Sequence, residues 1–112
     1  MYQDIIRNLS LEEKMRFTSG AGAWHTWDAE GKLPQIMMCD GPHGLRKQKQ
    51  DAPGQNNDSI PATCFPTESA LACSWNPEAV RRMAQAIAQE AIAEDVSIVL
   101  GCGVNMKRSP LC

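Results

Sequence analysis

The strongest hydrophobic pattern in the chain follows Asn76. Asn76 is a favourable N-cap, Pro77 suits the first helical position, and Glu78 places a negative charge in the first turn. Apolar residues then recur at helical spacing, at Val80, Met83, Ala84, Ile87, Ala88, Ala91 and Ile92. The pattern predicts an amphipathic helix that ends near Glu94 or Asp95 and buries one stripe.

Two short apolar runs flank this helix and predict buried strands. QIMMCD, residues 35–40, lies between a proline and the turn former Asp40-Gly41-Pro42, and VSIVLG occupies residues 96–101. Strands separated by a helix favour parallel pairing in a βα-repeat fold of the α/β class. A complete eight-stranded barrel needs about 250 residues, so 112 residues would supply its first few strands.

Weaker signals predict the remaining elements. Ser10 and Glu13 have the spacing of a capping box, which predicts a short helix that ends before Gly20 and Gly22. The polar segment at 47–59 predicts a solvated loop. Residues 61–65, PATCF, are interpreted as a short strand, and the TESALACS segment after Pro66 as a short helix.

Composition excludes several classes of protein. Hydrophobic residues make up 43% and charged residues 21%, as in globular proteins, and a net charge of −2 gives no reason to expect nucleic acid or an anionic membrane as a partner. The five cysteines include no CxxC pair, and the sequence shows no signal peptide, so reduced thiols in the cytoplasm are expected. His25 and His43 are not at metal-ligand spacing, and we expect no metal or cofactor.

Polar residues follow both predicted strands, where a βα barrel carries its working groups. Asp40 and Arg46 follow the first strand, and Lys107 and Arg108 follow the second. A carboxylate that accepts hydroxyl hydrogen bonds, flanked by guanidinium groups that donate in a fixed fork, suits a sugar or another polyol.

Each candidate also has a structural explanation. Asp40 could be a turn former that bonds backbone amides, Arg46 could belong to a solvated basic face, and Arg108 could pair with a structural carboxylate. Trp24 and Trp27 could stack on a sugar ring or simply pack within the protein.

Five ordered blocks resemble the beginning of glycoside hydrolase family 3, chiefly its β-glucosidase branch. They are DGPHGLR, PATCFPT, LACSWNPE, GCGVN and KRSPLC, preceded by SLEEK and SGAGAWHT. The resemblance implies that residues 1–112 are an incomplete N-terminal piece of a (β/α)8, TIM-type barrel, with a polar loop at 47–59. In this family the barrel is followed by further domains.

The resemblance also implies an activity and a site. Such enzymes release β-linked glucose or related sugars from non-reducing ends with retention. Asp40 would hold hydroxyls of the sugar in the innermost subsite, and Arg46 and Arg108 would donate hydrogen bonds to the same sugar or to Asp40. The family's nucleophile, acid/base and lysine-histidine pair would come from segments other than these residues. We therefore predict no catalytic residue and no activity in the chain alone, which would need the remainder of the parent enzyme.

Two other classes remain as alternatives. A free-standing carbohydrate-binding or interaction module would need a closed core and a complete pocket. A nucleotide-binding α/β protein would need a glycine motif that opens a helix, whereas Gly101-Cys102-Gly103 is followed within a few residues by Pro110.

Overall fold

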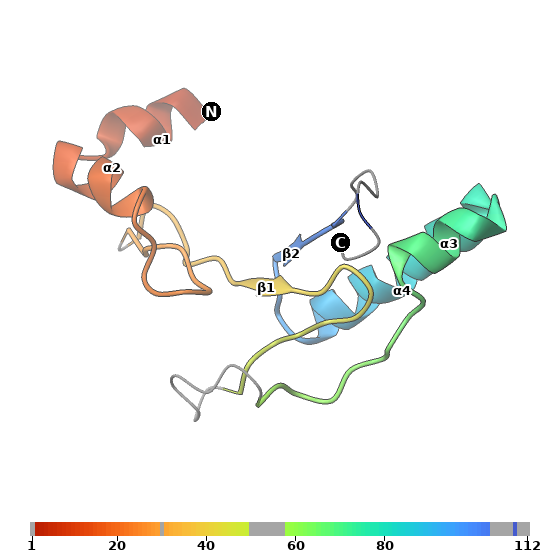
Figure 1. Cartoon of the computed structure of the whole chain (residues 1–112). Helices are drawn as coiled ribbons and strands as arrows, with labels where there is room; N and C mark the ends of the chain where they lie inside the picture. The colour runs from red at the N-terminus through yellow and green to blue at the C-terminus, as the bar shows by residue number, and fades with distance from the viewer. Residues whose placement is uncertain (1, 30, 50–57, 104–108, 110–112) are drawn as a thin grey trace.

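The computed structural model describes residues 2–29, 31–49, 58–103 and 109. Its elements, in chain order, are α1 (Tyr2–Asn8), α2 (Leu11–Phe17), β1 (Met38–Asp40), α3 (Glu68–Ser74), α4 (Pro77–Ala93) and β2 (Ile98–Leu100) (Figure 1). The strands β1 and β2 pair in parallel, with Cys39 opposite Val99. This arrangement confirms the predicted strand-helix-strand order and the parallel pairing.

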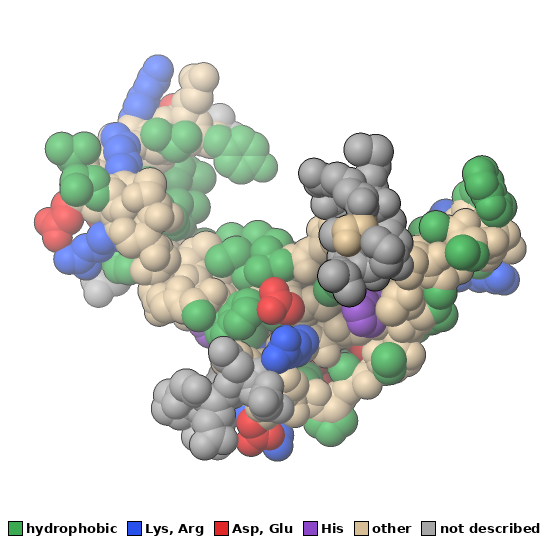
Figure 2. All heavy atoms as spheres, in the orientation of Figure 1, with side chains coloured by type: hydrophobic (Ala, Val, Ile, Leu, Met, Phe, Trp, Pro, Cys, Tyr) green, Lys and Arg blue, Asp and Glu red, His purple; other side chains and the backbone are tan. Residues whose placement is uncertain are grey.

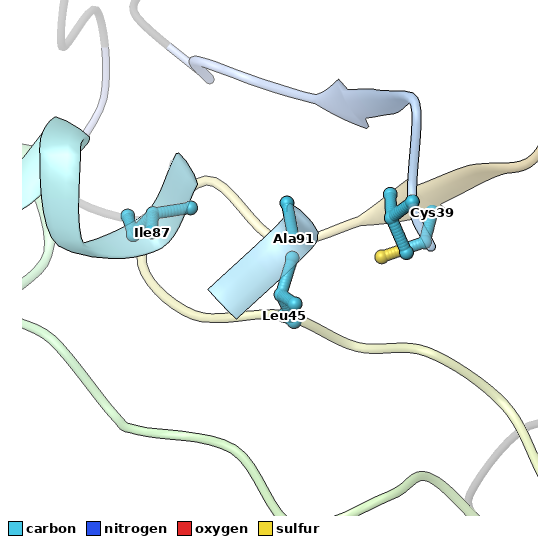
Figure 3. Packing of buried hydrophobic residues seen from close by; sticks show 5 residues of the cluster. Cys39, Leu45, Ile87 and Ala91 are labelled. Atoms are coloured by element: carbon cyan, nitrogen blue, oxygen red, sulfur yellow. The ribbon is translucent and has the colours of Figure 1, made fainter. Parts of the chain in front are cut away.

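The described sheet is covered on one face by α4. The buried cluster consists of Cys39, Leu45, Ile87, Ala91 and Val96 (Figure 3). Partly buried against it are Met37, Phe65, Met83 and Val99. Because side chains alternate along a strand, Asp40, Ile98 and Leu100 point to the other face. Ile98 and Leu100 are each 43% exposed, so the face that carries Asp40 is open.

The helix α4 forms where the sequence predicts it, but its buried stripe is narrower than expected. The Asn76 side chain accepts a hydrogen bond of 3.1 Å from the backbone N–H of Ala79, which confirms the predicted cap. Met83, Ile87 and Ala91, spaced by four, face the sheet. The parallel row of Val80, Ala84, Ala88 and Ile92 is exposed, Ile92 by 75%. A two-stranded sheet is narrow, so it covers only one row of the apolar stripe.

The capping box at the start of α2 is confirmed. Glu13 N–H donates to Ser10 Oγ at 3.1 Å, and Ser10 N–H donates to Glu13 Oε2 at 2.6 Å. The Glu13 carboxylate also accepts hydrogen bonds of 2.7 and 2.8 Å from Lys32 Nζ, which ties α2 to a later turn. The preceding helix α1 is not anticipated by the sequence analysis.

Trp27 packs against α2. Its ring lies 5.7 Å from that of Phe17 at 89°, and the guanidinium of Arg16 lies 5.1 Å from its centroid. These contacts favour the packing explanation for Trp27. Trp24 does not take part in these contacts and lies instead beside Asp40, Arg46 and Gln48.

Three boundaries differ from the sequence-based expectations. Residues 61–65 form no strand, because the Phe65 N–H donates to the carbonyl of His43, which lies in a turn, at 2.8 Å. The strand β1 begins at Met38 and not at residue 35. The two ends of the polar 47–59 segment are hydrogen-bonded to each other, since the Lys49 N–H donates to the Asp58 carbonyl at 3.0 Å. These ends are therefore more ordered than the predicted solvated loop.

The molecule is open and elongated. Its radius of gyration is 17.4 Å, whereas a compact domain of this length has about 13 Å. Figure 1 shows α1 and α2 at one end, α3 at the other, and the strands between them. Apolar side chains lie on the visible surface over both ends (Figure 2), and Tyr2, Leu11 and Trp75 are 79%, 75% and 91% exposed. Among the described residues, none of the helices has both the length and the apolar content needed to cross a bilayer.

Candidate functional site

The turn after β1 brings Asp40 and Arg46 together. The backbone N–H of Arg46 donates to the carbonyl of Asp40 at 2.8 Å. Gly41 and Gly44 have φ angles of +150° and +143°, which side chains disfavour. A Cβ at Gly41 would collide with the Gly44 carbonyl, and one at Gly44 with the Thr63 carbonyl. The two glycines therefore allow this tight turn.

Asp40 and Arg46 line two adjoining open hollows. One, of about 540 Å³, is also lined by the turn after β1 and by residues 100–103. The other, of about 240 Å³, is completed by Trp24 and Gln48. Trp24 therefore lies beside the candidate residues, where a sugar ring could contact it.

The Asp40 carboxylate is half-buried and has no hydrogen-bond or ion-pair partner within the described part of the chain. This finding counts against the turn-former explanation, in which the carboxylate would bond backbone amides. The oxygens remain available as acceptors for a hydroxyl-bearing ligand.

The end of β2 lies against the same turn. A Cβ at Gly101 would lie 3.0 Å from Cα of Pro42, so the loops after the two strands touch. Arg108, the third predicted binding residue, and Lys107 lie outside the described residues. The placement of Arg108 therefore stays a prediction.

The sequence analysis missed Glu68, the first residue of α3. Its Oε1 accepts a hydrogen bond of 3.1 Å from the N–H of Gly103, and its Oε2 lies 3.9 Å from Nδ1 of His43. The pKa of Glu68 is lowered by its own backbone N–H and then by that of Gly103, with the His43 charge adding to the effect and burial opposing it. The first-turn position was the only available signal, and it does not reveal a partner thirty-five residues away.

The other titratable candidates belong to the scaffold. Cys39 is 1% exposed, as the buried strand predicted for residues 35–40 requires, and burial raises the pKa of its thiol. Cys64, Cys73 and Cys102 are free and exposed. Within the described ranges, no group of three or more His, Cys, Asp or Glu side chains is arranged to hold a metal ion.

Several curated proteins that are similar in sequence to this chain are glycosidases. No protein-family profile matches the sequence. The chain is 54% identical to the thermostable β-glucosidase B of Acetivibrio thermocellus over 96% of the chain, and 49% identical to an exo-α-(1→6)-L-arabinopyranosidase of Bifidobacterium longum over 95%. The chain spans only 15% and 14% of the length of these two enzymes.

Solved structures with a similar fold are also β-glucosidases. The β-glucosidase of Kluyveromyces marxianus, determined in complex with glucose, matches 96% of the chain with a TM-score of 0.85 at 29% identity. β-Glucosidase 3B of Thermotoga neapolitana, determined in complex with α-D-glucose, matches 98% with a TM-score of 0.80 at 27% identity. The chain covers 12% and 17% of those two chains.

The fold is therefore that of a piece of an α/β protein, and the chain is similar over nearly its whole length to a part of known glycosidases. The chain is related to the β-glucosidases of glycoside hydrolase family 3, as the ordered sequence blocks predict.

Proposed function

We propose that residues 1–112 form the beginning of the (β/α)8 barrel of a retaining exo-glycosidase and supply part of its innermost sugar subsite. The substrate would be a β-linked glucoside or a related saccharide. The observation that carries the proposal is the Asp40 carboxylate, which has no partner among the described residues and lies beside Arg46 on the open face of the parallel sheet. The names of the relatives support the substrate class.

In this proposal Asp40 accepts hydrogen bonds from two sugar hydroxyls, and Arg46 and Arg108 donate to the sugar or to Asp40. These contacts orient the sugar so that its glycosidic bond faces the reacting carboxylates. Retention requires two carboxyl groups about 5–5.5 Å apart, one to attack and one to protonate the leaving oxygen. Asp40 is occupied in binding, so both groups come from the remainder of the enzyme and the chain alone is inactive.

The proposed setting is the cytoplasm, in keeping with the free cysteines among the described residues. No cofactor, nucleic acid or membrane takes part in the proposed reaction.

The test uses the full-length enzyme, meaning the complete polypeptide that contains residues 1–112. Asp40→Ala removes two charge-assisted hydrogen bonds, each worth about 1.5 kcal/mol or more, so kcat/KM for an aryl β-glucoside should fall at least about 100-fold. Asp40→Asn keeps the shape but loses the charge and should also be impaired. The exposed Asp28→Asn is the matched control and should leave turnover unchanged. Wild-type kinetics for Asp40→Ala at unchanged Tm would remove Asp40 from the site.

A further inference from the structure

Glu68 contacts both loops that form the larger hollow. Its carboxylate accepts a hydrogen bond from Gly103, which follows β2, and lies 3.9 Å from His43, which lies in the turn after β1. The two loops otherwise meet where Pro42 lies against Gly101. Glu68 is thus a side-chain bracket between the ends of two neighbouring parallel strands.

The partners of this bracket are themselves held in place. The carbonyl of His43 accepts a hydrogen bond of 2.8 Å from Phe65, three residues before Glu68. The Nδ1 atom of His43 is buried and has no hydrogen-bond partner among the described residues. Oε2 of Glu68 lies 3.9 Å from this nitrogen, beyond hydrogen-bonding distance, and forms an ion pair with it when His43 is protonated.

We propose that Glu68 is a positioning residue of the sugar site, which holds the turn bearing Asp40 and Arg46 against the loop that follows β2. The inference rests on the proposed function of Asp40 and Arg46. Loss of the bracket would free this turn from the Gly103 backbone, so that Asp40 and Arg46 would no longer be held in place.

A role confined to α3 does not explain the contacts. A glutamate in a first turn stabilises the helix dipole without reaching another segment. Glu78 shows this local behaviour in α4, where it accepts hydrogen bonds of 3.0 and 2.9 Å from Arg81 on the same helix. Glu68 instead reaches the chain after β2. Glu78 is therefore the matched control for Glu68.

The experiment compares Glu68→Ala, Glu68→Gln, Glu78→Ala and Asp40→Ala in the full-length enzyme. Calorimetry would measure the Kd for glucose, steady-state kinetics would measure kcat and KM for an aryl β-glucoside, and melting would measure Tm. Glu68→Ala should weaken glucose binding and lower kcat/KM about tenfold or more, because small misplacements of binding groups are costly. Its Tm should fall no further than that of Glu78→Ala.

Glu68→Gln should recover most of the lost affinity, because its amide oxygen still accepts a hydrogen bond from Gly103. If Asp40→Ala is impaired while Glu68→Ala keeps the wild-type Kd and KM, the positioning role is wrong and the proposed function stands. A lower Tm with an unchanged Kd would likewise reduce Glu68 to a structural residue. If Asp40→Ala behaves as wild type, both proposals fail.

Discussion

The backbone N–H of Arg46 donates a hydrogen bond of 2.8 Å to the carbonyl of Asp40, and the two residues thereby face each other across the turn formed by residues 41–45. Asp40, which ends β1, and Arg46, six positions later, consequently line the same two hollows. The geometry of the backbone brings them together. The properties of the site should therefore depend on residues that never touch a ligand.

Gly44→Ala tests this dependence. An alanine at this position would need a φ of +143° and would collide with the Thr63 carbonyl, so we expect a loss of about 1–3 kcal/mol in stability and weaker glucose binding in the full-length enzyme. Gly22→Ala is the control, because Gly22 has a φ of +133° but nothing within 4 Å of an added Cβ. Calorimetry and denaturant unfolding measure both effects. Equal glucose affinity in the two variants would contradict the proposed role of the turn.

Ile98→Ala tests whether the open face of the sheet is buried inside a closed barrel in the full-length enzyme. Ile98 is 43% exposed on the open face of the described sheet, but in a closed barrel this face is filled by layers of side chains. We expect Ile98→Ala to destabilise the full-length enzyme by about 2–4 kcal/mol in denaturant unfolding. The exposed α4 variant Gln85→Ala should change stability by less than about 0.5 kcal/mol. A similarly small value for Ile98→Ala would mean that the face stays open.

Glu13→Gln tests an electrostatic tie at the N-terminal end. The hydrogen bond from Lys32 lowers the pKa of Glu13 below its ordinary value of 4.5, and the backbone N–H of Ser10 lowers it further. The folded state therefore favours the charged form, so the stabilisation is complete above pH 4.5 and disappears as the pH falls through the lowered pKa. Wild type should melt above Glu13→Gln at pH 7, and the gap in Tm should close as the pH falls below 4.5 and through the lowered pKa of Glu13. A gap that is independent of pH would contradict the charged interaction.

The isolated 112-residue chain should show no cooperative melting transition and no upward shift with glucose. Its apolar side chains and sheet edges are open, and an elongated shape leaves too little buried surface to offset the loss of conformational entropy. A ligand at about 100 times its Kd would stabilise a folded module by about 2.7 kcal/mol. A cooperative transition raised by glucose would thus favour the free-standing carbohydrate-binding module over the enzyme fragment.

Local patterns in the sequence account for much of the fold. The caps at Ser10 and Asn76 and the β-branched run before Gly101 predict α2, α4 and β2, because each depends on neighbours a few residues away. The PATCF segment was predicted wrongly as a strand, because its backbone partner, the carbonyl of His43, is set by a distant turn. The apolar stripe of α4 was correct in periodicity but too wide, because burial depends on the size of the surface it meets.

By itself the sequence determined the strand-helix-strand order of β1, α4 and β2, the position of Asp40 and Arg46 after a strand, and the resemblance to family 3 β-glucosidases. These follow from spacing, capping and turn chemistry, which act between near neighbours. Only the tertiary structure decided that the Asp40 carboxylate lies on the open face, without a side-chain partner in the described part of the chain, and that Glu68 reaches Gly103 across thirty-five residues. Such contacts arise when parallel strands align their carboxyl ends, and no local pattern carries that information.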